Sequence, residues 1–474
     1  MRKWTWFTLL AAALTLGIGG AVYWLGPETP EWTTSSPEAL AEMRLGLESS
    51  MRFYENEARA HFDRALELDA NFVAARLRRL PFIEREDKDK FKAEIASLKA
   101  VDREPLSDRE RFLLDYSLTR VEKEHAKGDK LLTAYLERYP RDPFVLSIRC
   151  NLAFQARRSA QASDCLRRLL AIDPNWAMAQ NQLGYIAMAE GRFEEAEELF
   201  KTYLFIASEQ ANPHDSMAEL LILRGRYDEA ERQLVEAVRI RPDFCIPWRR
   251  RIQIQVLRGD GAAALAAFEK MRVDGQCRKA EVEAARCYAE TWEATLRGAL
   301  EEAWQMQRGP GCADGDEDHA VAVRFGFVLG HDLEAREMLA AVRERDHLYG
   351  DREPVLRALV QHLSAIEIAA GAPLPDNGPA PTEPWRRVAD FFAAADRTLS
   401  YQGADEGNLK LFNRLDWARV LADLGQTADA EALRSEVEAV NPAIAKTFHG
   451  FPRNTQEWRR GGWPPAARSA TTTP

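Results

Sequence analysis

A segment of seven residues recurs along the chain at a fixed distance. Gly191–Glu197 reads GRFEEAE, and Gly225–Glu231, 34 residues later, reads GRYDEAE. Pro174 and Pro242 are separated by 68 residues, twice that distance. A repeat of this length accommodates two helices with their turns, and it restricts the chain to folds in which one helical hairpin stacks on the next.

The same pattern extends beyond these two copies. It is clearest over residues 143–278, continues back to residue 38, and persists in a degraded form over residues 279–370. A linker rich in proline and glycine, residues 371–384, precedes a last helical segment with one more copy, residues 385–446. One hairpin cannot bury its apolar face alone, so we expect an all-α solenoid in which neighbouring hairpins share the core.

Capping residues mark several expected helix starts. Ser36, Asp142 and Asn212 each precede a proline, an order that places a side-chain cap before the first helical residue. Ser107, with Glu110 three residues later, has the spacing of a capping box. Residues 80–105 are charged and irregular, and we expect them to be a softer region of the array.

An uncharged run, residues 4–25, follows two basic residues near the amino terminus. It is long enough to cross a bilayer, has aromatic residues at both ends, and exceeds the apolar core usual in a cleaved signal peptide. We therefore expect a transmembrane signal anchor, with a cleaved signal peptide as the alternative. Basic residues precede the run and acidic residues follow it, so the positive-inside rule leaves residues 1–3 in the cytoplasm and the rest outside, beyond a polar spacer at residues 26–37.

Small residues line one side of this expected anchor. Ala13, Gly17 and Ala21 are spaced so that two such helices could pack closely as a homodimer. Small residues are also common in membrane helices that have no partner, and this simpler interpretation is the favoured one.

The six cysteines are even in number, which suits an oxidising compartment. Cys150 and Cys165 fall on the two helices of one expected hairpin and are the best candidates for a disulfide. Cys277 and Cys312 flank the next helix pair and form a weaker candidate. No CxxC motif and no cysteine–histidine cluster occurs in the sequence, so we expect no metal site.

The sequence also argues against an enzyme and against a nucleic-acid partner. It contains no Walker loop, no GxSxG motif and no HExxH motif, and we expect neither catalysis nor a cofactor. Its net charge of −10 disfavours binding to a phosphate backbone, which requires a basic face. The tail at residues 450–474 is expected to be disordered.

The repeat resembles the tetratricopeptide repeat, whose unit has 34 residues and two helices. More narrowly, residues 36–72, 105–118 and 211–244 are similar to the repeat region of bacterial transmembrane serine/threonine kinases and winged-helix regulators. In those proteins a cytoplasmic kinase or DNA-binding domain precedes the membrane span. Only three residues precede the expected span here, so the resemblance implies a sensing or partner-binding region without its effector domain.

The resemblance also implies a binding surface, the inner face of the superhelix, formed by the first helix of each hairpin. Its expected residues are Asn151, Phe154, Asn181, Tyr185, Met188, Asp215, Glu219, Ile222, Arg249 and Gln253. This mixed strip could hold an extended peptide, although every solenoid has an inner face whether or not it binds there. Asn181 and Tyr185 stand where some relatives have the Lys and Asn that clamp a C-terminal carboxylate, so that clamp is not expected.

The function predicted from these features is that of a membrane-anchored bacterial scaffold, displayed in the periplasm or outside the cytoplasm, that binds protein or peptide partners of the envelope. Two alternatives stay open. One is a ligand-sensing subunit that acts with a separate membrane effector. The other is a noncatalytic accessory subunit of an envelope enzyme complex.

Overall fold

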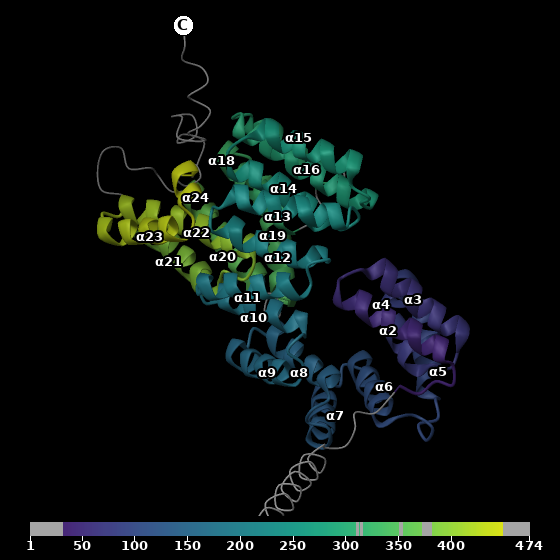
Figure 1. The fold of residues 1–474 in the computed structure, drawn as a ribbon. Helices are drawn as coiled ribbons and strands as arrows, with labels where there is room; N and C mark the ends of the chain where they lie inside the picture. Colours follow the sequence, from purple (N-terminus) through teal and green to yellow (C-terminus); the bar gives the residue numbers. More distant parts are fainter. Residues whose placement is uncertain (1–31, 310–311, 313–315, 350–353, 372–381, 449–474) are drawn as a thin grey trace, which may run out of the picture. The chain divides into compact units, whose positions relative to one another are not determined.

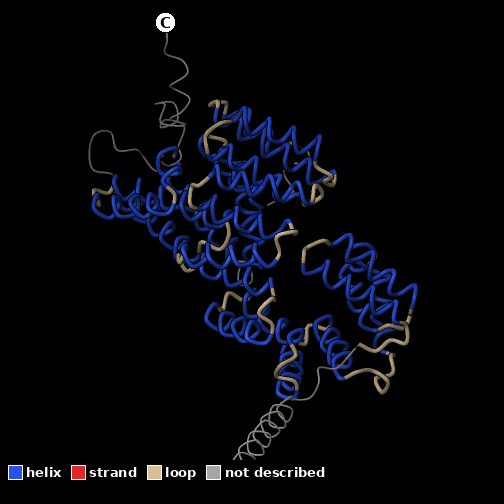
Figure 2. Tube along the Cα trace, in the orientation of Figure 1, coloured by secondary structure: helices blue, strands red, loops and turns tan. Residues whose placement is uncertain are grey.

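The computed structural model describes residues 32–309, 312, 316–349, 354–371 and 382–448, and every regular element among them is an α-helix (Figures 1 and 2). They form two compact units, which meet in sequence between Ala179 and Gln180 and are called here the N-terminal and the C-terminal unit. The predicted all-α class is therefore confirmed for this part of the chain.

The expected membrane anchor cannot be followed in the structure. Residues 4–25 lie outside the described residues, as do the first half of the spacer, most of the 371–384 linker and the whole 450–474 tail. Among the helices that the structure does describe, none combines the length and the apolar character that a bilayer span requires.

The N-terminal unit consists of four described hairpins. They pair α2 (Pro37–Met51) with α3 (Glu55–Leu68), α4 (Val73–Glu86) with α5 (Lys88–Lys99), α6 (Asp108–Val121) with α7 (His125–Arg138), and α8 (Pro143–Gln155) with α9 (Ser159–Ile172). The region predicted to be softer, residues 80–105, is helical as far as Lys99, where it forms the hairpin of α4 with α5, and is irregular only at residues 100–105. The Asp87 carboxylate accepts hydrogen bonds from the first N–H groups of α5, and Ile95 and Leu98 are buried while the charged residues face outward.

The C-terminal unit continues the repeat and then departs from it. Its first helices are α10 (Ala177–Ala189), which begins just before the unit boundary, α11 (Phe193–Ile206), α12 (Ala211–Leu223), α13 (Tyr227–Ile240), α14 (Cys245–Leu257) and α15 (Gly261–Asp274). Its later helices are α16 (Lys279–Leu296), α17 (Leu300–Gln307), α18 (Asp316–Leu329), α19 (Asp332–Tyr349), α20 (Pro354–Gly371), α21 (Thr382–Thr398), α22 (Ala404–Asp423), α23 (Thr427–Val440) and α24 (Pro442–Thr447).

A glycine on the first helix and a phenylalanine on the second lock a hairpin together in both units. A Cβ atom on Gly46 would lie 2.4 Å from the Phe62 ring, and one on Gly184 would lie 2.5 Å from the Phe200 ring. Both rings are fully buried. Only glycine leaves room for the ring at this spacing, which explains why the two helices of each hairpin approach so closely.

The turn inside the hairpin is left-handed at positions one repeat apart. Gly191, Gly225 and Gly259 have φ angles of +73°, +69° and +77°. The preceding copies use Lys123 and Arg157 at the equivalent positions, with φ angles of 60° and 53°. Glycine adopts this conformation without steric cost, which explains the GR signature of the clearest copies.

The predicted caps are confirmed at two of the three proline positions. The Ser36 hydroxyl accepts the N–H of Ala39, and the Asp142 carboxylate accepts the N–H groups that open α8. The cap predicted at Asn212 is wrong, because α12 already begins at Ala211. The Asn212 side chain instead accepts a hydrogen bond from the buried Tyr203 hydroxyl at 3.3 Å.

Three disulfides are present, each within one hairpin and the connection that follows it. Cys150–Cys165 joins α8 to α9, the pairing expected from the sequence. The expected pairing of Cys277 with Cys312 is wrong, because the structure forms Cys245–Cys277 and Cys287–Cys312. Because α17 has only eight residues against eighteen in α16, the chain after α17 returns beside Cys287 in the middle of α16. Cys277 bonds instead to Cys245 at the start of α14. The described chain has no free cysteine.

Candidate functional site

The inner face of the C-terminal unit is occupied by the chain's own C-terminal helices. In that unit α22 crosses α12, and Gly407 lies so close to Leu223 that a Cβ atom there would approach its Cδ1 to 2.6 Å. Asn441, at the start of α24, donates a hydrogen bond from Nδ2 to the Ile222 carbonyl at 3.1 Å. Helices α22–α24 therefore fill the space where the sequence predicted a bound peptide.

Helices α22–α24 and the loop before them, residues 399–448, are called here the cover. A charged network of Tyr185, Asp215, Glu219 and Arg250 lies beneath it. Arg250 donates to Asp215 at 3.1 Å and to Glu219 at 2.6 Å, and the Tyr185 hydroxyl donates to the Glu219 carboxylate. Asp215 and Glu219 are 4% and 6% exposed. Two carboxylates thus share one guanidinium in a buried site, where an unpaired charge would be strongly unfavourable.

Burial changes the acid–base behaviour of this network. It raises the pKa of Asp215 to about 7, and the nearby carboxylates of Glu219 and Asp405 add to the increase, while Arg250 opposes it. Asp215 therefore takes up a proton near neutral pH, whereas a carboxyl in an unfolded chain does so only near pH ~3.9.

We expect the C-terminal unit to become more stable as the pH falls from 8 to 5. The pKa of Asp215 is higher in the folded chain than in the unfolded chain, so protonation of Asp215 stabilises the folded unit. This stabilisation is fully present below the unfolded pKa and is lost as the pH rises through about 7. The melting temperature of the wild type, measured across this range, is compared with that of Asp215→Asn, which cannot ionise. The variant should show a smaller pH dependence; equal slopes for both proteins would contradict the assignment.

The remaining predicted groove residues of the C-terminal unit have different environments. Met188 and Ile222 are fully buried in the core, and Asn181 is 4% exposed. Gln253 is half-buried and donates a hydrogen bond to Asp405 of α22 at 2.8 Å. Arg249 alone among the eight is exposed. A peptide could reach Glu219, Ile222 and Gln253 only by displacing Gly403, α22 and Asn441.

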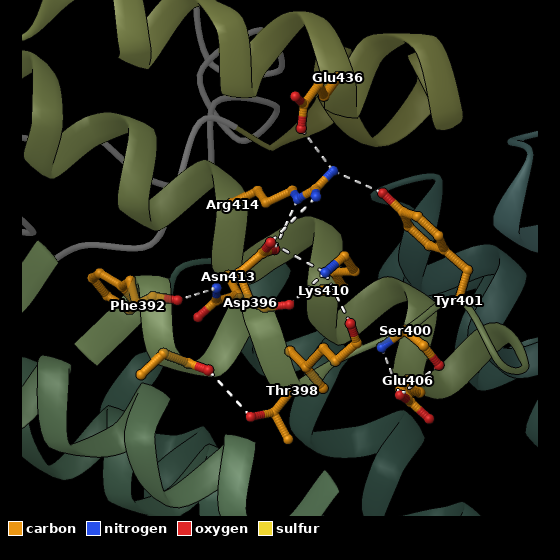
Figure 3. Close-up of polar contacts among 12 residues, drawn as sticks. Phe392, Asp396, Thr398, Ser400, Tyr401, Glu406, Lys410, Asn413, Arg414 and Glu436 are labelled. Atoms are coloured by element: carbon orange, nitrogen blue, oxygen red, sulfur yellow. Dashed lines mark hydrogen bonds and ion pairs between the residues drawn. The ribbon is translucent and has the colours of Figure 1, made fainter. Parts of the chain in front are cut away.

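The covering segment is itself held by a polar cluster, shown in Figure 3. Asp396 of α21 accepts from Lys410 Nζ at 3.1 Å and from Arg414 Nε at 2.8 Å, both on α22. Arg414 also reaches the Tyr401 hydroxyl at 2.8 Å and Glu436 of α23 at 2.9 Å. Burial lowers the pKa of Lys410, while Asp396 opposes that change. The cluster joins three helices around the loop that enters the inner face.

The loop between α21 and α22, residues 399–403, contacts the inner face directly. Tyr401 packs edge-on against Phe193 of α11, with ring centroids 5.4 Å apart, and Gly403 lies against the Glu219 carboxylate with a φ of +90°. The Glu406 carboxylate holds the loop by accepting hydrogen bonds from the Ser400 N–H at 2.7 Å and from the Ser400 hydroxyl at 2.9 Å (Figure 3). The cover is therefore an ordered part of the fold.

The N-terminal unit presents a different surface on the first helices of its hairpins. The Arg78 guanidinium of α4 lies 4.7 Å from the centre of the Phe144 ring of α8, and Trp32 packs edge-on against the same ring at 5.3 Å. Arg109 of α6 lies over Trp32 and pairs with the buried Asp142 at 2.9 Å. The side chains of Trp32, Arg78, Arg109 and Phe144 are called here the Arg78 cluster.

Arg78 differs from Arg109 in having no carboxylate partner among the described residues. Burial lowers its pKa to about 10, so it keeps its charge at neutral pH. A half-buried cation beside aromatic rings, without a counter-ion, is suited to an acidic or carbonyl-rich segment of a partner. The sequence gives no sign of this position, because nothing in the pattern distinguishes Arg78 from its paired neighbours Arg76 and Arg79.

An extended segment of the chain already lies beside this cluster. Thr33 donates its N–H to Glu110 at 2.7 Å, and its hydroxyl accepts the N–H of Ser107 at 2.8 Å. Ser107 caps α6 as predicted, but the Glu110 carboxylate accepts from Thr33 and from the Ser107 hydroxyl, so the capping box is only half formed.

Asn151 and Phe154, the two predicted groove residues of this unit, are half-buried on α8.

The comparisons with known proteins agree with the repeat. The family model for the tetratricopeptide repeat matches residues 187–250, which include α11, α12 and α13, and the resemblance to this repeat is confirmed there. Among curated proteins, none matches the sequence significantly.

Several solved structures are similar in fold at low identity. A tetratricopeptide repeat protein from Parabacteroides merdae is 14% identical over 60% of this chain and 98% of its own, with a TM-score of 0.36. PilW, a type IV pilus biogenesis factor, is 14% identical over 42% of this chain and 93% of its own, with a TM-score of 0.35. PilF of Pseudomonas aeruginosa is 16% identical over 50% and 91%, with a TM-score of 0.28.

Proposed function

We propose that this chain is a noncatalytic scaffold that binds a protein partner through the Arg78 cluster of its N-terminal unit. The single observation that carries this proposal is the half-buried Arg78 guanidinium, which has aromatic neighbours and no carboxylate partner among the described residues. Tetratricopeptide repeats commonly bind proteins, and the predicted alternative surface on α10, α12 and α14 is covered by α22–α24.

We further propose that residues 4–25 anchor the chain in the cytoplasmic membrane, with both units on the outer side among envelope proteins. The length and flanking charges of that run support an anchor. The three disulfides support an oxidising compartment, since such bonds persist mainly outside the cytoplasm. Pairing of two anchors through Ala13, Gly17 and Ala21 would make the scaffold bivalent.

A matched pair of variants tests the partner site. Full-length protein in detergent is used to capture partners from solubilised envelope, as wild type, as Arg78→Ala and as Arg168→Ala. Arg168 is an exposed arginine on α9, so its replacement removes the same charge elsewhere on the unit. We expect Arg78→Ala to reduce the enriched partner about fivefold or more, because a hydrogen bond from the charged guanidinium to a carboxylate or carbonyl of the partner contributes ~1–3 kcal/mol. Arg168→Ala should retain it.

Two results would contradict the proposal. One is equal enrichment by wild type and Arg78→Ala, which would place the contact elsewhere. The other is equal loss with both variants, which would indicate a nonspecific effect of charge.

A further inference from the structure

The closed inner face of the C-terminal unit leaves a cavity of about 230 Å³. It is lined by residues of the first helices of successive hairpins, namely α14, α16, α18, α20 and α22, together with Phe448, and it is partly open to solvent. It is larger than the ~150 Å³ cavity that is known to admit benzene in an engineered protein core. A small organic molecule therefore fits where the fold leaves no room for a peptide.

The walls of the cavity are mainly apolar. They include the rings of Trp292, Phe325, Phe412 and Phe448 and several leucine side chains. Phe412 and Phe448 meet edge to face with centroids 5.1 Å apart. Burial of apolar ligand surface against such walls supplies most of the binding free energy in a pocket of this kind.

One side of the cavity carries a polar chain whose members bond to one another. Arg324 pairs with Asp416 and donates to His362 Nε2 at 3.2 Å. His362 donates from Nδ1 to Asn413 Oδ1 at 2.9 Å, and Asn413 in turn donates to the Phe392 carbonyl at 3.0 Å. Burial, aided by Arg324, lowers the pKa of His362 to about 4, which keeps the imidazole neutral. These side chains already have hydrogen-bond partners within the wall, so they do not need a ligand to supply them.

Asn408 of α22 is different. Its side chain lines the cavity and is 5% exposed, and within the described part of the chain neither Oδ1 nor Nδ2 has a hydrogen-bond partner. Buried amides in folded proteins almost always have partners. A ligand group that both donates and accepts would satisfy the two ends of Asn408 at once.

The charges around the cavity restrict the ligand further. Asp405, Glu406 and Asp416 line it against the single cation Arg324, which is already paired with Asp416. An anion would therefore be repelled. We propose that this cavity binds a small, uncharged, mostly apolar molecule through one carboxamide group that pairs with the Asn408 side chain. This inference is independent of the protein partner proposed for the N-terminal unit.

Three probes of similar size test the proposal on the full-length protein in detergent. They are benzamide, which carries the amide; benzoate, which carries a negative charge instead; and ethylbenzene, which is apolar throughout. Ligand-observed NMR titration gives the affinity of each. We expect saturable binding of benzamide, no saturable binding of benzoate, and binding of ethylbenzene weaker by about tenfold, the effect of ~1.4 kcal/mol of hydrogen bonding.

The decisive variant is Asn408→Leu, which keeps the volume of the side chain and removes its polar atoms. It should bind benzamide about tenfold more weakly while its melting temperature stays equal or rises, because a buried unpaired amide has been removed. Gln276→Leu, an exposed amide on the same unit, should leave binding unchanged. The proposal is overturned if benzamide does not bind saturably, if benzoate binds as well, or if Asn408→Leu and wild type bind benzamide equally.

Discussion

Replacing Arg250 by methionine should cost the C-terminal unit about 3–5 kcal/mol of unfolding free energy at pH 8, where Asp215 is mostly ionised, because it leaves two buried carboxylates without their cation. Asp215 and Glu219 both bond to this guanidinium and are nearly inaccessible to water. Methionine fills much of the same volume, so the loss reports charge more than packing. Urea unfolding of the full-length protein measures it, and hydrogen exchange of α12 and α14 assigns it to this unit.

The adjacent arginine provides the control. Arg249 is exposed, and Arg249→Met should change the unfolding free energy by less than about 0.5 kcal/mol. In the Arg250→Met background, Asp215→Asn and Glu219→Gln together should restore part of the loss, because the uncompensated charges are then gone. A small effect of Arg250→Met, or no recovery in the triple variant, would mean that the pair is not desolvated as the structure indicates.

Local repeat physics made most of the fold predictable. The 34-residue period, the glycine turns at Gly191 and Gly225, and the caps at Ser36 and Asp142 each depend on residues that are neighbours in sequence. The Cys150–Cys165 disulfide was predictable for the same reason, because the two residues lie on the two helices of one hairpin. Predictions that used charge as a sign of irregularity were less successful. Residues 80–105 are charged because that hairpin exposes one side to water, and their helices still bury Ile95 and Leu98.

The candidate sites depended on contacts between distant segments, which a repeat pattern does not encode. Asn441 lies 219 residues from Ile222, and Asp405 lies 152 residues from Gln253. A periodic sequence indicates which residues face inward, but it does not indicate that a later helix will cover them. The division of the chain at Ala179 has no mark in the sequence either, because it falls inside a helix of a regular repeat.

Two glycines with the same backbone conformation should respond very differently to alanine. Gly191 and Gly225 have φ angles of +73° and +69°, so Gly→Ala at either should cost about 1–2 kcal/mol of backbone strain. At Gly191 the new methyl group meets nothing within 4 Å. At Gly225 it would lie 2.5 Å from Asn441 Oδ1, a distance at which the Asn441 side chain or its helix must move.

The movement at Asn441 is what separates the two variants. Asn441 holds the Ile222 carbonyl and caps α24 through its contact with the Ile444 N–H, so its displacement should add about 1–3 kcal/mol to the cost of Gly225→Ala. The added loss should appear as faster hydrogen exchange in α22 and α24 and earlier proteolysis of residues 404–448, with Gly191→Ala unchanged in both respects. Identical behaviour of the two variants would show that the C-terminal helices do not depend on this contact to cover the inner face. If Gly225→Ala instead exposes that face without unfolding α12 and α13, the groove predicted at Asn181, Tyr185 and Glu219 becomes available, and the cover acts as an internal competitor for whatever binds there.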